Sequence, residues 1–142
     1  MKNSTSSVII VLTILVFLSE AEDGPSSINI DFSNGSPLQD NDFTIVNNNI
    51  NSITAEGRLQ SLSLTCETLK IDVLVITECK LSESIPSNLI SVPGYHEPLR
   101  RDRNINGGGV LIYISESLTF KQKNELPSQK FEYIWVVVRI ND

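Results

Sequence analysis

Two neighbouring segments decide how this chain folds: Asp-Val-Leu-Val-Ile-Thr-Glu-Cys-Lys-Leu (72–81) and Gly-Tyr-His-Glu-Pro-Leu-Arg-Arg-Asp-Arg-Asn-Ile-Asn-Gly-Gly-Gly-Val-Leu-Ile-Tyr-Ile (94–114). The unbroken apolar run from Val73 to Ile76 is too short for a usual helix and is typical of a strand buried on both faces. Glu78 stands where this strand ends. Ligands gather at the carboxyl ends of strands in open α/β sheets, so Glu78 is a candidate ligand for a hard cation. The alternative is a polar residue that only marks the return to solvent.

A strand and a helix are predicted before this buried strand. Phe43 to Val46 predicts a strand, and the three asparagines at 47–49 favour a loop after it. An apolar stripe at three- and four-residue spacing predicts a helix from about Ala55 to Lys70, with Thr54 as N-cap and Glu56 near the positive end of the helix dipole. The stripe consists of Leu59, Leu62, Cys66 and Leu69. With the strand at 72–77 the helix completes a β-α-β unit, whose right-handed crossover makes the two strands parallel.

A loop and further strands are predicted after the buried strand. The loop at 80–93 contains two prolines and at most one helical turn. Segments 95–101 and 110–115 predict a hairpin, and the glycines of 106–109 supply the positive φ angles for its reversal. Val110, Ile112 and Ile114 are expected on one face of the sheet, and Leu111 and Tyr113 on the other. The remaining predictions are a short strand or connection at 118–123, a turn at 126–129 and a last strand at 133–140.

Five features in this order carry a resemblance to a known family. They are Asn-Ile-Asn-Ser-Ile (49–53) before the helix, the strand that ends in Thr-Glu (77–78), Pro-Gly-Tyr (93–95), Arg-Asp-Arg (101–103) and the triple glycine (107–109). In combination, from about Phe43 to Ile140, the chain resembles the endonuclease/exonuclease/phosphatase superfamily, and specifically the apurinic-endonuclease-like domain of non-LTR retrotransposons. The resemblance implies an α+β fold, the four-layer α/β/β/α sandwich of the DNase-like type, here truncated to roughly its first half.

The resemblance also implies the chemistry and the residues that perform it. In the family, Mg²⁺ (or Mn²⁺) is held by an Asn after the first strand and a Glu after the second, which match Asn49 and Glu78, with Asn51 as a further candidate close to the metal. Oxygen ligands of this kind suit Mg²⁺, which keeps waters for a phosphate. The implied reaction is phosphodiester hydrolysis that nicks target DNA. From residue type alone, the asparagines are also suited to capping a loop.

Three arginines, Arg100, Arg101 and Arg103, form the one local basic cluster, and Glu97 and Asp102 offset it. In the resembling family this hairpin lies beside the substrate groove, so phosphate contact is one role. A solvated hairpin with an internal Arg-Asp pair is the other, and the residues favour it slightly.

The triple glycine lacks the Lys-Ser/Thr of a P-loop, so it is interpreted as a turn. His96, the only histidine, is expected in a surface loop, and no zinc site is predicted.

The later motifs of the resembling family have no counterpart in these 142 residues. They are a Tyr-Arg-Pro-Pro-like strand, Gly-Asp-x-Asn and Ser-Asp-His, which supply the transition-state Tyr, the groups that orient the nucleophile and the Asp-His pair. A missing base and a misplaced nucleophile cost several powers of ten in rate, so no useful turnover is expected from this chain alone. The second sheet is likewise expected to be missing, which would leave one face of the first sheet bare.

Composition limits the partners of the chain. Its 142 residues suffice for one small domain, and the net charge of −6 repels nucleic acid except at a local basic patch or a bound cation. Cys66 is expected as a buried thiol, and Cys79 as reactive only if its surroundings lower its pKa. The sequence indicates no small-molecule cofactor and does not determine the oligomeric state.

The amino-terminal segment predicts where the protein is found. Residues 1–21 are typical of a signal peptide, with Lys2, an apolar core at 8–18 and small residues before a cut near Ala21. The core is too short to span a bilayer, so no span is expected in the mature chain; a buried strand or helix is the alternative. A polar arm follows at 22–42 and the candidate domain at 43–142. A working leader would make the protein secreted, whereas a retroelement enzyme would be nuclear or intracellular, unless a retroelement fragment has been joined to an unrelated leader.

Two further functions stay open. A small secreted binding or structural protein without catalysis would use the sheet fragment for interaction, and a leader and the Asn34-Gly35-Ser36 glycan acceptor would suit it. A secreted DNase-like enzyme shares the superfamily but lacks the same residues.

Overall fold

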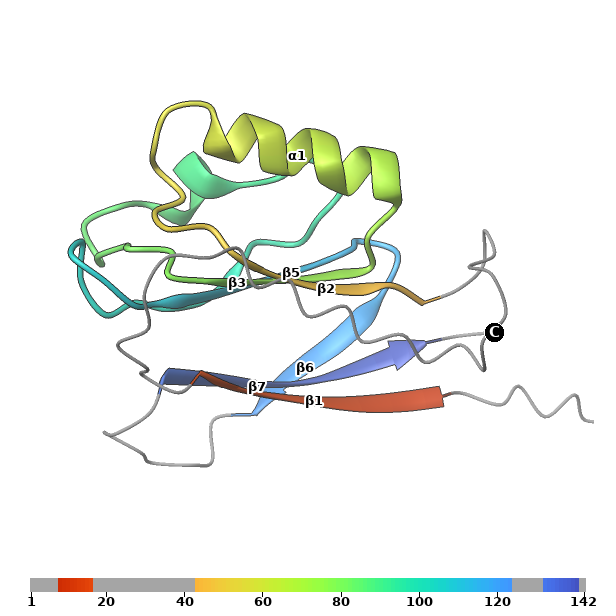
Figure 1. Cartoon of the computed structure of the whole chain (residues 1–142). Helices are drawn as coiled ribbons and strands as arrows, with labels where there is room; N and C mark the ends of the chain where they lie inside the picture. The colour runs from red at the N-terminus through yellow and green to blue at the C-terminus, as the bar shows by residue number, and fades with distance from the viewer. Residues whose placement is uncertain (1–7, 17–42, 124–131, 141–142) are drawn as a thin grey trace, which may run out of the picture.

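The computed structural model describes residues 8–16, 43–123 and 132–140, which form a small α+β fold in three layers. Helix α1 (Arg58–Leu69) covers one face of a four-stranded sheet, and a three-stranded sheet lies against the other face (Figure 1). The strands are β1 (Val8–Val16), β2 (Ile45–Asn49), β3 (Val73–Thr77), β4 (Leu99–Arg101), β5 (Val110–Ile114), β6 (Thr119–Lys123) and β7 (Glu132–Ile140), and a 3-10 turn, η1, spans Ser87–Ile90. Among the described residues, no helix is long and apolar enough to cross a membrane.

The four-stranded sheet has the order β2-β3-β5-β4. β2 and β3 are parallel, with Ile45 opposite Val73 and Asn49 opposite Thr77, and α1 connects them. The β-α-β unit predicted from the sequence is therefore confirmed. β5 pairs antiparallel with β3 and with β4, so the hairpin prediction is also confirmed. This topology brings the carboxyl ends of β2 and β3 to the same edge of the sheet.

Alternating side chains of the central strands divide the core into two parts. On the side of α1, the helix-side core takes Leu74 and Ile76 from β3 and Leu111 and Tyr113 from β5. On the other side, an inter-sheet core joins the opposite residues of β3 and β5 to β7. Its buried members are Ile45, Val73, Val75, Val110, Ile112, Ile114, Ile134, Val136 and Val138. Since successive side chains of a strand point to opposite faces, β3 and β5 supply both cores, as their unbroken apolar sequences predict.

The prediction that one face of the first sheet is left bare is wrong. β6 and β7 return beneath the four-stranded sheet and pair with each other from Thr119 opposite Arg139 to Lys123 opposite Trp135. The prediction rested on the missing later motifs of the family and assigned no second sheet to the strands after Ile114. Instead Ile134, Val136 and Val138 are buried against that sheet, because burying both apolar faces stabilises the fold more than lengthening one layer.

The predicted leader contains a strand. Val8–Val16 forms β1, which pairs antiparallel with β7 from Val8 opposite Ile140 to Val16 opposite Glu132. β7 is therefore the central strand of the order β1-β7-β6. The predicted polar arm at 22–42 and the predicted turn at 126–129 lie outside the described residues.

The ends of α1 and of β2 differ from the predictions. Asn47 to Asn49 belong to β2, because their backbones pair with β3 and this tertiary pairing overrides their preference for loops. Turns occupy 53–57, so α1 begins after Gly57, and neither Thr54 nor Glu56 has the predicted role at the helix start. Leu62 and Cys66 are buried as predicted, but Leu69 is 58 % exposed, because α1 ends there with Lys70 in a left-handed conformation.

Candidate functional site

The candidate site lies at the edge of the sheet where β2 and β3 end. Beyond the paired strands the two backbones stay together, because Ser52 N–H donates to the Glu78 carbonyl at 2.8 Å and Ile53 N–H donates to the Cys79 carbonyl at 3.0 Å. Asn49, at the end of β2, lies opposite Thr77, the residue before Glu78. The structure therefore brings the two predicted ligand residues to one edge.

Glu78 is half-buried and held by the glycine loop between β4 and β5. Its Oε2 accepts a hydrogen bond from the Gly108 N–H at 2.8 Å. The loop is also fixed by its backbone, since Lys80 N–H donates to the Gly108 carbonyl at 3.0 Å. The triple glycine thus lies against the candidate ligand and orients its carboxylate. The sequence predicted only a turn here, and no spacing in the sequence indicated this contact.

The asparagines have different surroundings. Asn49 is exposed, and its Oδ1 accepts the Asn51 N–H at 3.2 Å, a short local turn. The side-chain oxygen of Asn51 accepts a hydrogen bond from the Lys80 ammonium, and Arg58 donates to the Ile50 and Asn51 carbonyls. Two cations therefore hold the segment after β2. The sequence analysis missed both, although Lys80 lies only two residues after Glu78.

Backbone strain is concentrated at this edge. Of the five non-glycine residues with positive φ in the described part of the chain, four lie here: Asn51, Ser52, Glu78 and Lys80. The fifth, Lys70, ends α1. Each such residue costs about 1–2 kcal/mol, and strain of this kind clusters at functional sites. The hydrogen bonds between 50–53 and 77–79 hold the strained residues in place.

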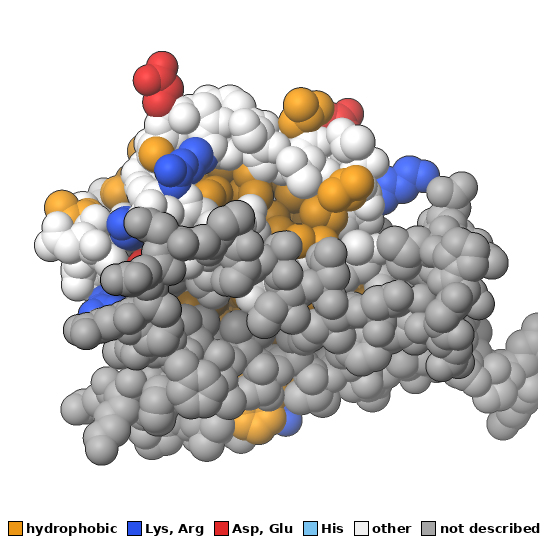
Figure 2. All heavy atoms as spheres, viewed as in Figure 1, with side chains coloured by type: hydrophobic (Ala, Val, Ile, Leu, Met, Phe, Trp, Pro, Cys, Tyr) orange, Lys and Arg blue, Asp and Glu red, His pale blue; other side chains and the backbone are white. Residues whose placement is uncertain are grey.

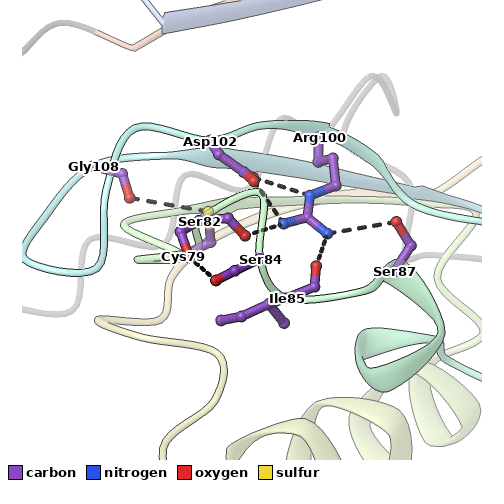
Figure 3. A network of polar contacts seen from close by, with 8 residues as sticks. All are labelled: Cys79, Ser82, Ser84, Ile85, Ser87, Arg100, Asp102 and Gly108. Carbon is purple, nitrogen blue, oxygen red and sulfur yellow. Dashed lines mark hydrogen bonds and ion pairs between the residues drawn. The ribbon is translucent and has the colours of Figure 1, made fainter.

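Arg100 is not available to a phosphate. Its guanidinium pairs with the Asp102 carboxylate through Nε at 3.0 Å and Nη2 at 2.6 Å, and also donates to the carbonyls of Ile85 at 2.7 Å and Ser82 at 3.0 Å (Figure 3). Hydrogen bonding to Asp102 raises the pKa of Arg100. The internal pair that the sequence slightly favoured is confirmed, and it ties β4 to the loop after β3. A phosphate would have to displace Asp102 or a carbonyl to reach the Arg100 guanidinium.

Arg101 and Arg103 are exposed and stay candidates for phosphate contact. Lys and Arg side chains gather at the left end of the molecule in Figure 2, where β2 and β3 finish in Figure 1. Two cations, Arg58 and Lys80, donate hydrogen bonds to the segment after β2 at this edge, and Arg101 lies opposite Val110, next to the glycine loop. These cations locally oppose the net charge of −6.

His96 is more than a surface loop residue. It is half-buried, its Nε2–H donates to the Leu118 carbonyl at 3.0 Å, and its ring packs edge-on against Phe120 with 5.2 Å between ring centres. The side chain thus fixes the start of β6. It belongs to neither the glycine loop nor the edge that carries Glu78, so it has no role in the candidate site.

The donors at this edge limit the metals that it could hold. Within 8–16, 43–123 and 132–140, no three His, Cys, Asp or Glu side chains come together as a metal cluster. Cys66 and Cys79 are both buried, and burial raises the pKa of the Cys66 thiol. A cation here would have one carboxylate, amide oxygen and water as ligands. Mg²⁺ and Mn²⁺ accept such a set, whereas structural zinc prefers four protein ligands.

Two hollows lie elsewhere on the surface. One of about 570 Å³ lies between the end of α1 and the start of β3, and is lined by Cys66, Asp72 and Tyr95 among others. Burial raises the pKa of Asp72, an effect that the hydrogen bond from the Thr44 N–H at 2.8 Å opposes. The other, of about 550 Å³, lies beside Arg100. Asn49 and Glu78 line neither of these two hollows.

No family model matches this chain, and no curated protein matches it.

Proposed function

We propose that this chain carries the cation-binding part of a Mg²⁺-dependent (or Mn²⁺-dependent) phosphodiesterase of the endonuclease/exonuclease/phosphatase type, with DNA as its substrate class. One observation carries the proposal. Parallel pairing of β2 and β3 brings Asn49 and Glu78 to one strained edge, where Gly108 orients the carboxylate. The layer order of helix, sheet and sheet agrees with a four-layer α/β/β/α sandwich, which a helical layer outside β1, β7 and β6 would complete.

The residues at this edge fit the cation. Glu78 Oε2 accepts one hydrogen bond, which leaves the carboxylate capacity for a metal, and the Asn49 side-chain oxygen accepts one weak bond. Mg²⁺ in phosphoryl-transfer sites is commonly held by one or two carboxylates, with waters and substrate phosphate as the other ligands. Bound there, the cation would polarise the scissile phosphate and stabilise the leaving 3′-oxygen.

Other residues at the edge position the Glu78 carboxylate or would attract the DNA backbone. Gly108 N–H keeps the Glu78 carboxylate aimed along the edge, and the Lys80 and Arg58 side chains hold the segment after β2 in its strained conformation. Arg101 and Arg103, exposed residues at and after the end of β4, would contact the DNA backbone. Contacts with phosphates attract the DNA and fix its position but do not read its bases, so we propose no preference for a DNA sequence.

Binding is expected without efficient cleavage. Neither a Gly-Asp-x-Asn nor a Ser-Asp-His motif occurs in the 142 residues, and the single histidine, His96, is bonded to Leu118. Hydrolysis needs a group that orients or deprotonates the attacking water, and such a group contributes about 10²–10⁴-fold to the rate. The purified chain is therefore proposed to bind the cation and DNA and to nick DNA no faster than a Glu78 variant.

Paramagnetic broadening by Mn²⁺ tests the metal site directly. On titration of the 1–142 chain, amide resonances of residues 49–51, 78–80 and 107–108 should broaden first, and Glu78→Gln should abolish this. Glu83→Gln removes an exposed carboxylate of the adjacent loop and serves as the matched control, which should leave the broadening unchanged. Equal broadening in wild type and Glu78→Gln would reject the site.

A plasmid-nicking assay with Mg²⁺ and a DNA-binding titration test the rest. No nicking above the Glu78→Gln background is expected, whereas the double variant Arg101→Ala/Arg103→Ala should weaken binding of duplex DNA and reduce its salt dependence. Nicking that Glu78→Gln abolishes would mean that this chain assembles a complete active site, which would overturn the proposed inactivity. Unchanged DNA binding in the double variant would remove DNA as the substrate class.

A second candidate function is a small secreted binding protein without catalysis. The observation that favours it is the packing of both faces of the four-stranded sheet, by α1 on one side and by β7 on the other, which gives the described residues a closed core. A folded chain that binds neither Mn²⁺ nor DNA would support this candidate. Recovery of glycosylated protein outside the cell would separate it from a nuclear or intracellular enzyme.

A further inference from the structure

The central strand of the three-stranded sheet depends on the amino-terminal segment for most of its pairing. β6 pairs with β7 only from Trp135 to Arg139, on one edge. On the other edge β1 pairs with all nine residues of β7, from Glu132 to Ile140. The two strands have the same length and their ends coincide. β1 is therefore the longer of the two neighbours of β7.

The composition of β1 suits a strand. Its sequence is Val-Ile-Ile-Val-Leu-Thr-Ile-Leu-Val, in which every residue except Leu12 and Leu15 is β-branched. Such residues are stiff at χ1, which lowers their helix propensity and raises their strand propensity. The register sets apolar residues opposite apolar residues at the centre of the pair, with Leu12 opposite Val136. Composition and pairing agree.

The same residues form the apolar core of the predicted leader, and the two roles exclude each other. A cut near Ala21 would remove all of β1 and leave the nine-residue edge of β7 open. That edge reads Glu-Tyr-Ile-Trp-Val-Val-Val-Arg-Ile and contains no proline and only two charges. A long apolar edge of this kind pairs readily with other chains and promotes aggregation.

We propose that Val8–Val16 is a permanent strand of the folded protein, so that the edge of β7 is the binding site of this segment and the working protein retains it. The matched lengths, the full register and the β-branched composition identify the occupant as this segment. The proposal does not depend on the metal site, because β1 and β7 lie in the sheet that does not carry Glu78.

Cleavage of the folded chain tests this without requiring a fragment to refold. A recognition sequence for a site-specific protease is inserted between Ser33 and Asn34, the full chain is purified and cut, and the products are separated by gel filtration at low micromolar concentration. Because nine paired residues hold β1, the 1–33 fragment should co-elute with the 34–142 fragment. Hydrogen exchange should show protected amides within 8–16 before and after cutting.

Two proline variants provide the control. In an antiparallel strand, successive N–H groups point to opposite edges, so only one of Val11 and Leu12 donates to β7. Proline is tolerated where the N–H faces solvent and breaks the ladder where it does not. One of Val11→Pro and Leu12→Pro should therefore release the 1–33 fragment after cutting, while the other retains it.

Release of the 1–33 fragment from the unsubstituted chain would overturn the proposal, whatever the state of the remainder. Unprotected amides at 8–16 in the uncut chain would also overturn it. A 22–142 chain that is monomeric and melts at the same temperature as the full chain would show that β7 needs no partner on this edge. Association of 22–142 that a synthetic peptide of residues 6–18 reverses would confirm that the edge binds this segment.

Discussion

At the scale of single residues, neighbouring charged side chains of the hairpin formed by β4 and β5 have different surroundings. Arg100 and Asp102 are 18 % and 11 % exposed at their side chains, and their pair holds the loop after β3. Arg103, one residue further, is exposed. Arg100 is thus paired within the fold, whereas its neighbour Arg103 is exposed to solvent.

Arg100→Met should destabilise the fold by about 3 kcal/mol, because Asp102 and two carbonyls would lose their donor while remaining largely buried. Arg100→Lys keeps the charge without the fork of donors and should lie between wild type and Arg100→Met. Arg103→Ala, the exposed control, should stay within about 0.5 kcal/mol. Urea unfolding monitored by circular dichroism measures all three, and equal stability of Arg100→Met and wild type would contradict the structural role.

Asp72 makes stability depend on pH, because burial raises its pKa in the folded state above the ordinary value of 3.8. The folded protein binds this proton more tightly than the unfolded chain does, so the contribution of Asp72 to stability falls as pH rises from about 3.8 through the raised folded pKa. Asp72→Asn keeps an acceptor for the Thr44 N–H. The free energy of unfolding of Asp72→Asn minus that of wild type should therefore be larger at pH 7 than at pH 3.5. Denaturant unfolding at both pH values, with exposed Glu116→Gln as control, checks the sign. A stability difference from wild type that is the same at both pH values would contradict it.

At the scale of elements, the glycine loop lies in close contact with Cys79 just after β3, and this contact sets the position of the loop beside Glu78. A Cβ at Gly109 would lie 2.5 Å from the Cys79 Sγ, and Gly109 has φ of +88°. The loop can approach the end of β3 only because this residue has no side chain. The Gly108 hydrogen bond to Glu78 depends on that approach.

Gly109→Ala should therefore cost about 3 kcal/mol, from the left-handed backbone and the overlap with Cys79 together. Gly94→Ala is the matched control, because Gly94 has φ of +81° but nothing within 4 Å of its Cβ position, and it should cost only about 1 kcal/mol. Thermal unfolding measures both. Adding Cys79→Ala to Gly109→Ala should recover part of the loss relative to the sum of the single variants; strict additivity would argue against the overlap.

At the scale of the whole molecule, the four-stranded sheet belongs to two cores at once. β3 and β5 contribute buried residues to α1 on one side and to β7 on the other. Neither outer layer can leave without exposing a face of the same two strands. The three layers are therefore expected to unfold as one cooperative unit.

The single tryptophan, Trp135 on β7, and the helical signal of α1 report on opposite layers. Their urea transitions should coincide. Val136→Ala, which deletes two methyl groups at a fully buried position of β7, should lower stability by about 2 kcal/mol and shift both transitions equally. Val137→Ala, half-buried on the same strand, should cost less. A tryptophan transition that precedes the helical one would show that the second sheet is an independent unit.

The sequence by itself determined the helix, the central strands and the β-α-β topology, because apolar periodicity and chain length constrain local structure strongly. Val73 to Ile76 was predicted as a buried strand, and the two faces of Val110 to Ile114 were predicted correctly. The parallel pairing of β2 with β3 followed from the β-α-β unit, whereas Asn49 and Glu78 were assigned as ligands from the family resemblance. These features depend on residues near one another in the chain, which a sequence pattern records.

Only the tertiary structure decided which layers pack against each other and which charged side chains pair within the fold. Four contacts depend on specific partners in space: β7 lies beneath the first sheet, Val8–Val16 pairs with β7, Gly108 orients Glu78, and Asp102 pairs with Arg100. An apolar strand can extend a sheet or cover it, and an arginine can bind a carboxylate or a phosphate, with the same local sequence. The choice depends on which partner buries more apolar surface or satisfies more hydrogen bonds, and that is a property of the assembled chain.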